Sequence, residues 1–444
     1  MKVTKLPRDP GPAAWSAILP ELEPPTPVDG DMQADFLVIG AGFAGLAAAR
    51  RLSLGAPKAR IVVLDAVRVG EGPAGRNSGF MIDLPHDLAS DNYGGALDKD
   101  RAQISANRAA IDFALETAEA FGLPDEAIQR SGKINAAASA RGLTHNTDYA
   151  RHLSALDEPY DIYDAETMRT ITGIDYYRGG LYTPNAAIIQ PAMFVRGLAG
   201  GLRSNRVHIC EGSPVTALDA DGTGWRAATP AGSVTAGKVV LAVNGHAESF
   251  GLFQGRLAHV FTYASMTRAL AADEVNRLGG EPSWSATPAD PMGTTVRRIS
   301  GIGGDRIVVR NRFTYNPSME VDRTRIDAVA HSHDRAFTAR FPMLANVTME
   351  YRWGGRLCLS RNDAPAFGET APGLIAACCQ NGLGTAKGTL AGMAAADLAL
   401  GHDSDVLRFM SGTATPARLP PAPLAWLGAT AKIRWAEYAA GREM

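Results

Sequence analysis

The feature that most constrains the fold is a glycine pattern near the N-terminus. The stretch VIGAGFAGLAAARRL, residues 38–52, follows an apolar segment at 36–39 and carries Gly40, Gly42 and Gly45. Gly40 permits a tight turn, Gly42 lets a pyrophosphate approach the backbone, and Gly45 lets the next helix pack closely on the strand. We therefore predict a strand, a turn and a helix whose N-terminus faces a phosphate group.

A second strand supplies the acid that this pattern needs. Residues 61–64 form an apolar run that ends in Asp65, twenty residues beyond Gly45. A carboxylate there can accept hydrogen bonds from both hydroxyls of a ribose, and it repels a 2′-phosphate, which disfavours NADP. The register predicts a dinucleotide site. We expect Phe43 and Ala44, beside the glycines, and Ala66, beside the acid, to contact the cofactor as well. At this stage FAD and NAD both fit.

A second glycine-rich loop distinguishes between the two cofactors. VRVGEGPAGRNSGF, residues 67–80, comes directly after the ribose-binding strand. This arrangement resembles the D-amino-acid oxidase and sarcosine oxidase superfamily of FAD enzymes, and within it the branch of glutamylputrescine oxidoreductase and other bacterial amine oxidases. In that family the loop runs beside the pyrophosphate and the isoalloxazine. The resemblance thus implies a flavoprotein and assigns cofactor contacts to Gly75, Arg76, Asn77, Ser78 and Gly79.

Three further stretches extend the resemblance over roughly residues 33–400. They are GGLYTPNAAIIQPAMFVRGLA at 179–199, KVVLAVNGHA at 238–247, and WGGRLCLSRNDAPAFGETAPGLIAACCQNGLG at 353–384. By this resemblance Val215, which follows a predicted strand at 207–210, contacts the adenine end of FAD. Asn244 and Gly245 bracket the cofactor.

The loop near the C-terminus has a physical role that does not depend on the family. A buried strand at 374–379 leads into Gly382, Leu383 and Gly384, and a helix follows from Thr385 to about 400. A reduced flavin carries negative charge at N1 and the C2 carbonyl, where a helix N-terminus offers about half a positive charge. We expect the two glycines to allow close approach and Thr385 to donate its hydroxyl.

The resemblance also suggests residues for the substrate. Related oxidases place an arginine that grips a carboxylate where Arg356 stands in WGGR, and a guanidinium matches a carboxylate with two hydrogen bonds. A structural salt bridge is the alternative for Arg356. His259 and Tyr263 are expected at the substrate face of the flavin, with a buried core histidine as the alternative for His259. Cys358 lies two residues from the cysteine that attaches flavin in sarcosine oxidases, so we expect noncovalent FAD. Lys387 is one position beyond the lysine of those enzymes and is a doubtful site residue.

The charge balance and the cysteines narrow the class of protein. Lysine and arginine number 44 against 46 acidic residues, so no overall charge favours nucleic acid or an anionic membrane as a partner. The first residues lack a signal peptide's apolar stretch and no window of about 18 apolar residues could span a bilayer, so we expect a cytoplasmic protein without a membrane span. Four cysteines suit reduced thiols, and no metal-ligand spacing is present.

The chain divides into three parts. Seven prolines within residues 1–33 predict an arm on the surface, either a lid or oligomer contact or a packed extension. Residues 34–400 predict an α/β fold, with FAD-binding segments at about 34–95, 195–250 and 350–400 that form a Rossmann-like domain. Substrate-domain segments at about 96–194 and 251–349 interleave with it and form a mixed β-sheet. Residues 401–444 predict a tail helix packed on the body, with a membrane-surface helix as the alternative.

The expected reaction follows from the resemblance. An amine or amino acid loses hydride from its α-carbon to flavin N5, the imine hydrolyses, and oxygen or another acceptor reoxidises the flavin. Two alternatives stay open. One is an FAD dehydrogenase of a 2-hydroxy acid or an opine, and the other is a flavin-binding subunit of a hetero-oligomer.

Overall fold

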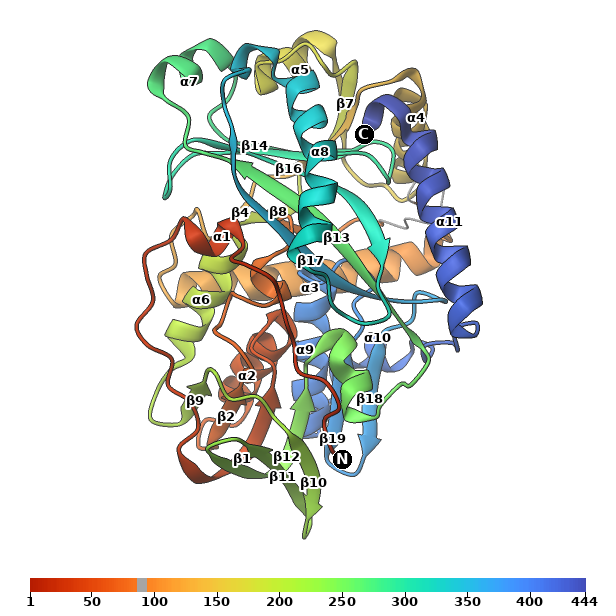
Figure 1. The fold of residues 1–444 in the computed structure, drawn as a ribbon. Helices are drawn as coiled ribbons and strands as arrows, with labels where there is room; N and C mark the ends of the chain where they lie inside the picture. Colours follow the sequence, from red (N-terminus) through yellow and green to blue (C-terminus); the bar gives the residue numbers. More distant parts are fainter. Residues whose placement is uncertain (86–93) are drawn as a thin grey trace.

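In the computed structural model, which describes residues 1–85 and 94–444, the predicted strand–turn–helix–strand unit lies inside a large sheet. The strand order across this first sheet is β10 (Ala217–Asp221), β11 (Gly224–Thr229), β12 (Gly232–Leu241), β1 (Gly30–Ile39), β2 (Ile61–Leu64) and β9 (Val207–Cys210). In addition, β19 (Leu374–Cys378) pairs with β12 and β18 (Ala366–Ala371) pairs with β19. The strands β12, β1, β2, β9 and β19 run parallel, and the sheet occupies the lower half of Figure 1.

The central strands are apolar because helices cover the sheet. Every residue of β2 and the last three residues of β1 are buried, as is typical of parallel strands. Helices α2 (Phe43–Gly55) and α9 (Ala386–Leu400) contact the strands, and α3 (Leu97–Ala120) and α6 (Pro191–Leu202) pack on those helices. A Cβ added at Gly392 of α9 would lie 2.1 Å from the carbonyl oxygen of Ala44, so the two helices approach where glycine leaves room. The strands predicted at 36–39, 61–64, 207–210 and 374–379 are present as β1, β2, β9 and β19.

The second sheet is mixed, as expected for the substrate domain, and lies above the first in Figure 1. Its strand order is β17 (Met349–Ser360), β13 (Leu257–Thr267), β16 (Arg306–Tyr315), β15 (Thr295–Ile299), β14 (Trp284–Pro288), β5 (Lys133–Ala137), β7 (Gly179–Thr183) and β6 (Asp161–Asp164). All neighbours are antiparallel except β14 and β5. Segments from both halves of the chain enter each sheet, which confirms the interleaved α/β fold.

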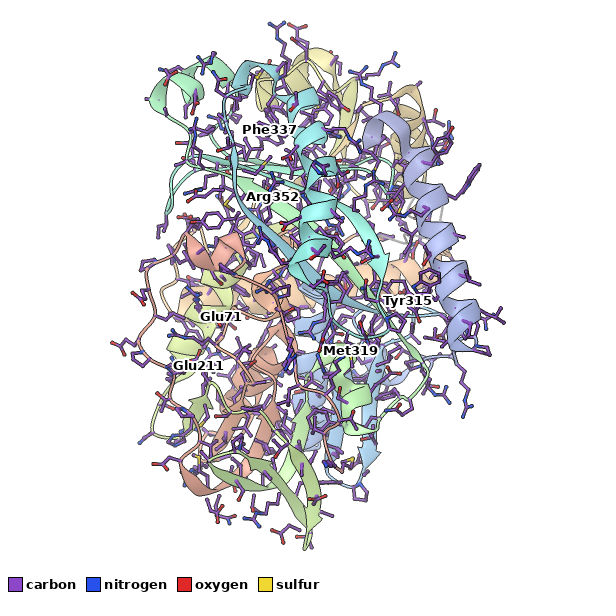
Figure 2. The ribbon with its side chains drawn as sticks, in the orientation of Figure 1. Glu71, Glu211, Tyr315, Met319, Phe337 and Arg352 are labelled. Atoms are coloured by element: carbon purple, nitrogen blue, oxygen red, sulfur yellow. The ribbon has the colours of Figure 1, made fainter. Side chains whose placement is uncertain are left out.

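Helix α8 (Arg323–Arg340) contacts β13, β16 and β17 of the second sheet. Its Phe337, marked in Figure 2, stacks on Phe341 with ring centroids 5.2 Å apart. A small sheet of β3 (Phe80–Met81), β8 (Ala187–Ile189) and β4 (Ile128–Arg130) completes the strands, and the remaining helices of this domain are α4 (Ala140–Ala155), α5 (Ala165–Thr172) and α7 (Ala272–Leu278).

The proline-rich N-terminal part lies along the body and contacts it at several points. Val3 donates its backbone N–H to Thr216 beside β10, and β1 already begins at Gly30. Between them, α1 (Ala14–Ala17) buries Trp15 completely, and the indole meets Trp353 edge to face at 6.4 Å. The prolines exclude long regular elements, but one helical turn is enough to insert an aromatic ring into the core.

The C-terminal part contains α10 (Asp405–Ser411) and α11 (Ala422–Ala440), the outer dark blue helix of Figure 1. The buried carboxylate of Glu437 attaches α11 to the body, since it accepts hydrogen bonds from Arg312 at 2.6 Å and from the N–H of Phe313 at 3.1 Å. Only Glu437 and Ala440 of α11 are buried, whereas Trp426 and Trp435 are 48% and 71% exposed, so the packing of the whole helix on the body stays a prediction. Among the described residues, no helix is long and apolar enough to cross a membrane.

Candidate active site

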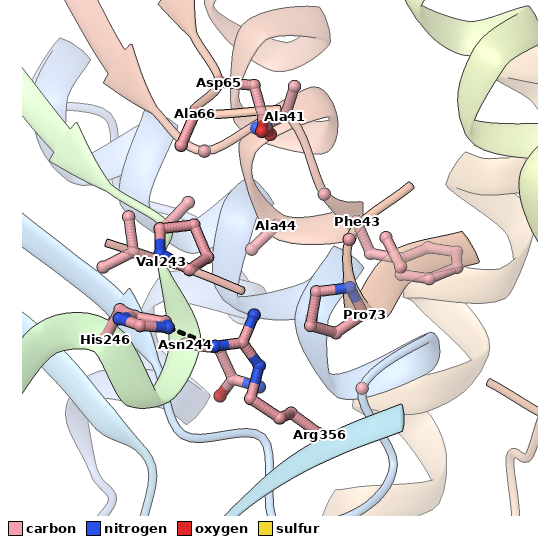
Figure 3. Close-up of a pocket in the computed structure, with 18 of the residues that line it drawn as sticks. Ala41, Phe43, Ala44, Asp65, Ala66, Pro73, Val243, Asn244, His246 and Arg356 are labelled. Carbon is pink, nitrogen blue, oxygen red and sulfur yellow. Dashed lines mark hydrogen bonds between the residues drawn. The ribbon is translucent and has the colours of Figure 1, made fainter. Parts of the chain in front are cut away.

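A large cavity lies where β1, β2 and β12 of the first sheet end. Its volume is about 240 Å³. Figure 3 shows Asp65 and Ala41 at one end of it and Arg356 with His246 at the other. The predicted cofactor residues that line it are Gly40, Gly42, Phe43, Ala44, Asp65, Ala66, Asn77, Ser78, Val215, Asn244, Gly382, Gly384 and Thr385. Ligands of open parallel sheets bind at the carboxyl ends of the strands, which is where this cavity opens.

The three glycines of the first turn have different neighbours. Gly40 has φ +103°, and a Cβ there would lie 2.6 Å from the carbonyl oxygen of Ala242. A Cβ at Gly45 would lie 1.7 Å from the carbonyl oxygen of Gly40, so Gly45 is required by helix packing and does not line the cavity. A Cβ at Gly42 would have only Ala74 near it, at 3.6 Å, and would project beside the open space. Gly42 is therefore the glycine that leaves room for a ligand.

Asp65 joins the turn to the cavity. Its two carboxylate oxygens accept hydrogen bonds from the N–H groups of Ala41 at 2.8 Å and Val67 at 3.0 Å. Burial raises the pKa of Asp65 to about 6, while the two N–H donors act in the opposite direction. Each oxygen retains a lone pair, and the side chain lines the cavity, so the carboxylate can accept hydrogen bonds from a ribose.

The other end of the cavity is formed by the glycine-containing loop at residues 382–384 and by the start of α9. A Cβ at Gly384 would meet nothing within 4 Å, which means that the backbone there borders open space. The hydroxyl of Thr385 donates to the carbonyl oxygen of Phe80 at 2.5 Å. What Thr385 and Gly384 offer the cavity is therefore the positive end of α9 and its backbone amides, not the predicted hydroxyl donor.

Arg356 and His246 form a buried polar cluster at this end. One guanidinium Nη1–H of Arg356 is donated to Nε2 of His246, and Nη2 lies 2.9 Å from the carboxylate of Asp9. Burial and the charge of Arg356 lower the pKa of His246 to about 3. The imidazole is thus neutral and carries its proton on Nδ1, which lies 3.2 Å from the hydroxyl of Ser249.

A second, smaller pocket of about 80 Å³ adjoins the first. Four residues line both, namely Ser78, Phe80, Leu357 and Gly382. The other residues of the small pocket are Ile82, Thr287, Pro288, Pro291, Thr295, Arg310, Phe313, Asn381 and Leu383. Among the described residues, the polar groups of this pocket are hydroxyls, an amide and one guanidinium, which lie among apolar side chains as in a small-molecule site.

A β-bulge aims two residues of β16 into this small pocket. Thr262 of β13 pairs with Phe313 and Tyr263 pairs with Asn311, so Arg312 is the extra residue, and its φ is +65°. Without the bulge, Arg310 and Phe313 would point to opposite faces of the sheet. With it, both line the same pocket, and the guanidinium of Arg310 lies 4.6 Å from the ring centroid of Phe313.

Comparison with known proteins identifies the family. The family model described as FAD-dependent oxidoreductase (DAO) matches residues 35–398. The chain belongs to this family. The OrdL protein of Haemophilus influenzae, described as a probable oxidoreductase, is 26% identical over 391 residues, which covers 86% of each chain. The gamma-glutamylputrescine oxidoreductase of Escherichia coli is 24% identical over 371 residues, 83% of this chain and 84% of that one.

Among solved structures, the crystal structure of glycine oxidase from Geobacillus kaustophilus has the same fold. The TM-score is 0.70 at 17% identity, and the match covers 88% of this chain and 100% of that one. The predicted family, the FAD cofactor and the two-domain α/β fold are thereby confirmed. The large cavity fits FAD, because it combines a ribose-binding acid, a glycine that leaves room for the pyrophosphate and a helix N-terminus at the far end.

Several residues predicted to bind FAD shape the site without lining the large cavity. A Cβ at Gly75 would lie 1.8 Å from the carbonyl oxygen of Gly70, and one at Gly79 would lie 2.0 Å from the guanidinium of Arg297. Arg76 is buried and donates to the carbonyl oxygens of Glu71 at 2.7 Å and Gly354 at 3.3 Å. These three therefore hold the loop in place. Gly45 and Gly245 are likewise packing positions, and Leu383 lines the small pocket.

His259 and Tyr263 line neither pocket. The imidazole Nε2 of His259 lies 2.7 Å from the carboxylate of Glu248, and the ring fills the space that a side chain at Gly245 would need. The hydroxyl of Tyr263 lies 2.6 Å from that of Thr314, and burial raises the pKa of this tyrosine. Both side chains thus form hydrogen bonds with other side chains of the protein and do not border the cavity.

Two residues bear on how FAD is held. Cys358 lines the large cavity, but a hydrogen bond with Cys379 and burial raise the pKa of its thiol well above the ordinary value, which disfavours the nucleophilic thiolate. Lys387 does not line the cavity, and its ammonium lies 3.5 Å from the carboxylate of Asp363. The raised pKa of Cys358 agrees with noncovalent binding of FAD. The position of Lys387 agrees with its exclusion from the site residues.

Sequence reasoning missed Arg310, His246 and the N-terminal residues Lys5, Leu6 and Pro7, all of which line one of the two pockets. The one available signal was for His246, in the stretch KVVLAVNGHA that was already assigned to the cofactor. Arg310 is one of three arginines within residues 306–312, and nothing in the sequence separates it from the other two. A proline-rich segment carries no periodicity that predicts its contacts.

Proposed function

We propose that this FAD-dependent oxidoreductase oxidises the C–N bond of an amino acid or of a primary or secondary amine, giving an imine that hydrolyses in water. The observation that carries the proposal is the small pocket, which opens onto the end of the FAD cavity away from Asp65 and contains Arg310. The names of two relatives support it, since one acts on gamma-glutamylputrescine and one fold neighbour is a glycine oxidase. The electron acceptor is oxygen or another oxidant.

The residues of the large cavity would hold FAD. Asp65 would accept hydrogen bonds from the ribose, the turn at Gly42 would receive the pyrophosphate, and the N-terminus of α9 beside Gly384 would face the flavin. FAD supplies the hydride acceptor, flavin N5. The protein contributes orientation and electrostatics.

Arg310 would bind an anionic group of the substrate. It is the one charged side chain among the described residues that line the small pocket. Arg356 was expected in this role, but successive side chains of β17 point to opposite faces of the sheet. Leu357 points into the small pocket, and Arg356 points away from it, toward Asp9. We therefore move the carboxylate-binding role from Arg356 to Arg310.

The same pocket would help the substrate to react. An amine must be unprotonated before hydride can leave its α-carbon. The apolar walls around Phe313 disfavour a charged group, so burial there would lower the pKa of a bound ammonium. The hydroxyl of Thr287 in this pocket is already hydrogen-bonded to Asn135 at 2.8 Å, which leaves its oxygen as an acceptor for the amine N–H.

The test is anaerobic mixing of the yellow holoprotein with a panel of compounds while the flavin absorbance is followed. The panel contains amino acids, their decarboxylated amines and the matching 2-hydroxy acids. We expect bleaching by an amine or amino acid, and production of the matching carbonyl compound. Bleaching by 2-hydroxy acids alone would overturn the proposal and favour a hydroxy-acid dehydrogenase.

A further inference from the structure

The N-terminal segment contributes to the large cavity, although it precedes the part of the chain that matches the family. Lys5, Leu6 and Pro7 line the cavity, whereas the family match begins at residue 35. The backbone N–H of Thr4 donates to the carbonyl oxygen of Ser249 at 2.9 Å, and Ser249 belongs to the same short element as His246, η2 (Asn244–Phe250). The segment thus covers the same end of the cavity as His246 and Arg356.

A buried ion pair connects this segment to the cavity wall. The carboxylate of Asp9 lies 2.9 Å from Nη2 of Arg356, and each side chain is 8% exposed. Because two buried charges attract strongly only when they are well paired, removing either one is costly to the other. The contact joins residues 347 positions apart in the chain. The N-terminal segment therefore determines where the Arg356 side chain lies.

The guanidinium of Arg356 is only partly paired. Nη1 donates to His246 and, at 3.5 Å, to the carbonyl oxygen of Met319, and Nη2 donates to Asp9, but the buried Nε has no hydrogen-bond partner within the described protein. Arg356 lines the large cavity, so its unpaired N–H groups are available to an acceptor on a ligand there. Leu357, the next residue, lines both pockets and thus marks the end of the large cavity that meets the substrate.

The flavin ring offers such an acceptor. Its pyrimidine part carries carbonyl oxygens, and the reduced flavin carries negative charge there. We propose that residues 5–9 and Arg356 form a flavin-binding element of this protein, in which Asp9 and His246 hold Arg356 so that its guanidinium binds the polar edge of the ring. The proposal rests on the FAD requirement of the proposed function.

This arrangement has an electrostatic consequence for the flavin. Asp9 neutralises most of the charge of Arg356, and His246 is uncharged. Removal of the carboxylate by Asp9→Asn leaves an unbalanced positive charge beside the ring, which stabilises the reduced, anionic flavin and raises its reduction potential. Arg356→Gln leaves the carboxylate of Asp9 unbalanced and lowers the potential. A residue that acts on the fold alone has no reason to shift the potential in opposite directions for these two variants.

The experiment compares these two variants with a chain that lacks residues 2–10 and with Asp29→Asn as the control. Asp29 is exposed, stands on the same N-terminal extension and does not line the cavity. The flavin reduction potential of each holoprotein is measured by spectroelectrochemistry, and FAD affinity by titration of the apoprotein followed by flavin fluorescence. Thermal unfolding of each apoprotein checks the fold.

We expect opposite shifts in potential for Asp9→Asn and Arg356→Gln, no shift for Asp29→Asn, and FAD affinity weaker by about ten- to a hundredfold for Arg356→Gln and for the deletion. Equal potentials in all holoproteins, or unchanged FAD affinity of the deletion, would overturn the proposal. If the unmodified protein itself binds no FAD, the proposed function fails instead, so the two failures are distinguishable.

Discussion

Substitution by alanine should affect different properties at Gly42 and Gly45: FAD affinity at Gly42 and the stability of the fold at Gly45. A Cβ at Gly42 has Ala74 as its nearest neighbour at 3.6 Å, an ordinary contact, and Gly42 precedes α2 as its N-cap. Gly42→Ala should therefore reduce the free energy of unfolding of the apoprotein by less than about 1 kcal/mol. The methyl group would stand where the pyrophosphate must approach the backbone. Loss of one hydrogen bond to a charged group is worth about 1.5–3 kcal/mol, so FAD affinity should fall about ten- to a hundredfold.

Gly45→Ala should instead damage the fold. Its methyl group would lie 1.7 Å from the carbonyl oxygen of Gly40, and neither backbone can move without separating α2 from β1. A cost on the order of 3 kcal/mol or more is expected in the apoprotein. The assays are thermal unfolding of both apoproteins and FAD titration by flavin fluorescence. Full FAD affinity in Gly42→Ala, or an unchanged unfolding temperature in Gly45→Ala, would refute the assignment of the two roles.

Three further predictions follow from the site. FAD affinity should be full above about pH 7 and should weaken about tenfold per pH unit below pH 6. The reason is that the carboxylate of Asp65, whose pKa is about 6 without ligand, must be ionised to accept hydrogen bonds from both ribose hydroxyls. An FAD affinity that stays constant from pH 8 to pH 5 would contradict this. Gly384→Val should move the start of α9 away from the flavin and lower its reduction potential, which spectroelectrochemistry measures against the wild type. Arg310→Met should weaken an amino-acid substrate about ten- to a hundredfold in anaerobic flavin reduction and Arg310→Lys less, while the decarboxylated amine should bind nearly as before.

The fold of the cofactor domain could be predicted because its signals are local. The strands predicted at 61–64 and 207–210 have those bounds in the structure, since continuous apolar runs between turn residues specify short buried strands. Glycines also bound the helix α2, which follows the N-cap Gly42 and ends at Gly55. The predicted contacts at Gly40, Gly42 and Asp65 belong to the same short stretch, and all three line the cavity.

The substrate site could not be predicted in the same way, because it depends on the alternation of long strands. The predicted arginine, Arg356, differs from Leu357 by one position, and one position exchanges the two faces of a strand. Arg310 and Phe313 line the same pocket only because of the bulge at Arg312. No glycine or other turn residue in the sequence predicts this bulge. The pairing of Asp9 with Arg356 spans most of the chain and has no local signal at all.

This geometry separates two properties of the site onto different elements. In the two proposals, Arg356 of β17, paired with Asp9 of the N-terminal segment, would bind the flavin, whereas Arg310 of β16 would bind the anionic group of the substrate. Substitution of Arg310 should therefore change substrate affinity while the flavin potential stays constant. Substitution of Asp9 should change the potential with the preference among amines preserved. If either change altered both properties to the same extent, the two pockets would be one electrostatic unit, and the division that the strand alternation suggests would not hold.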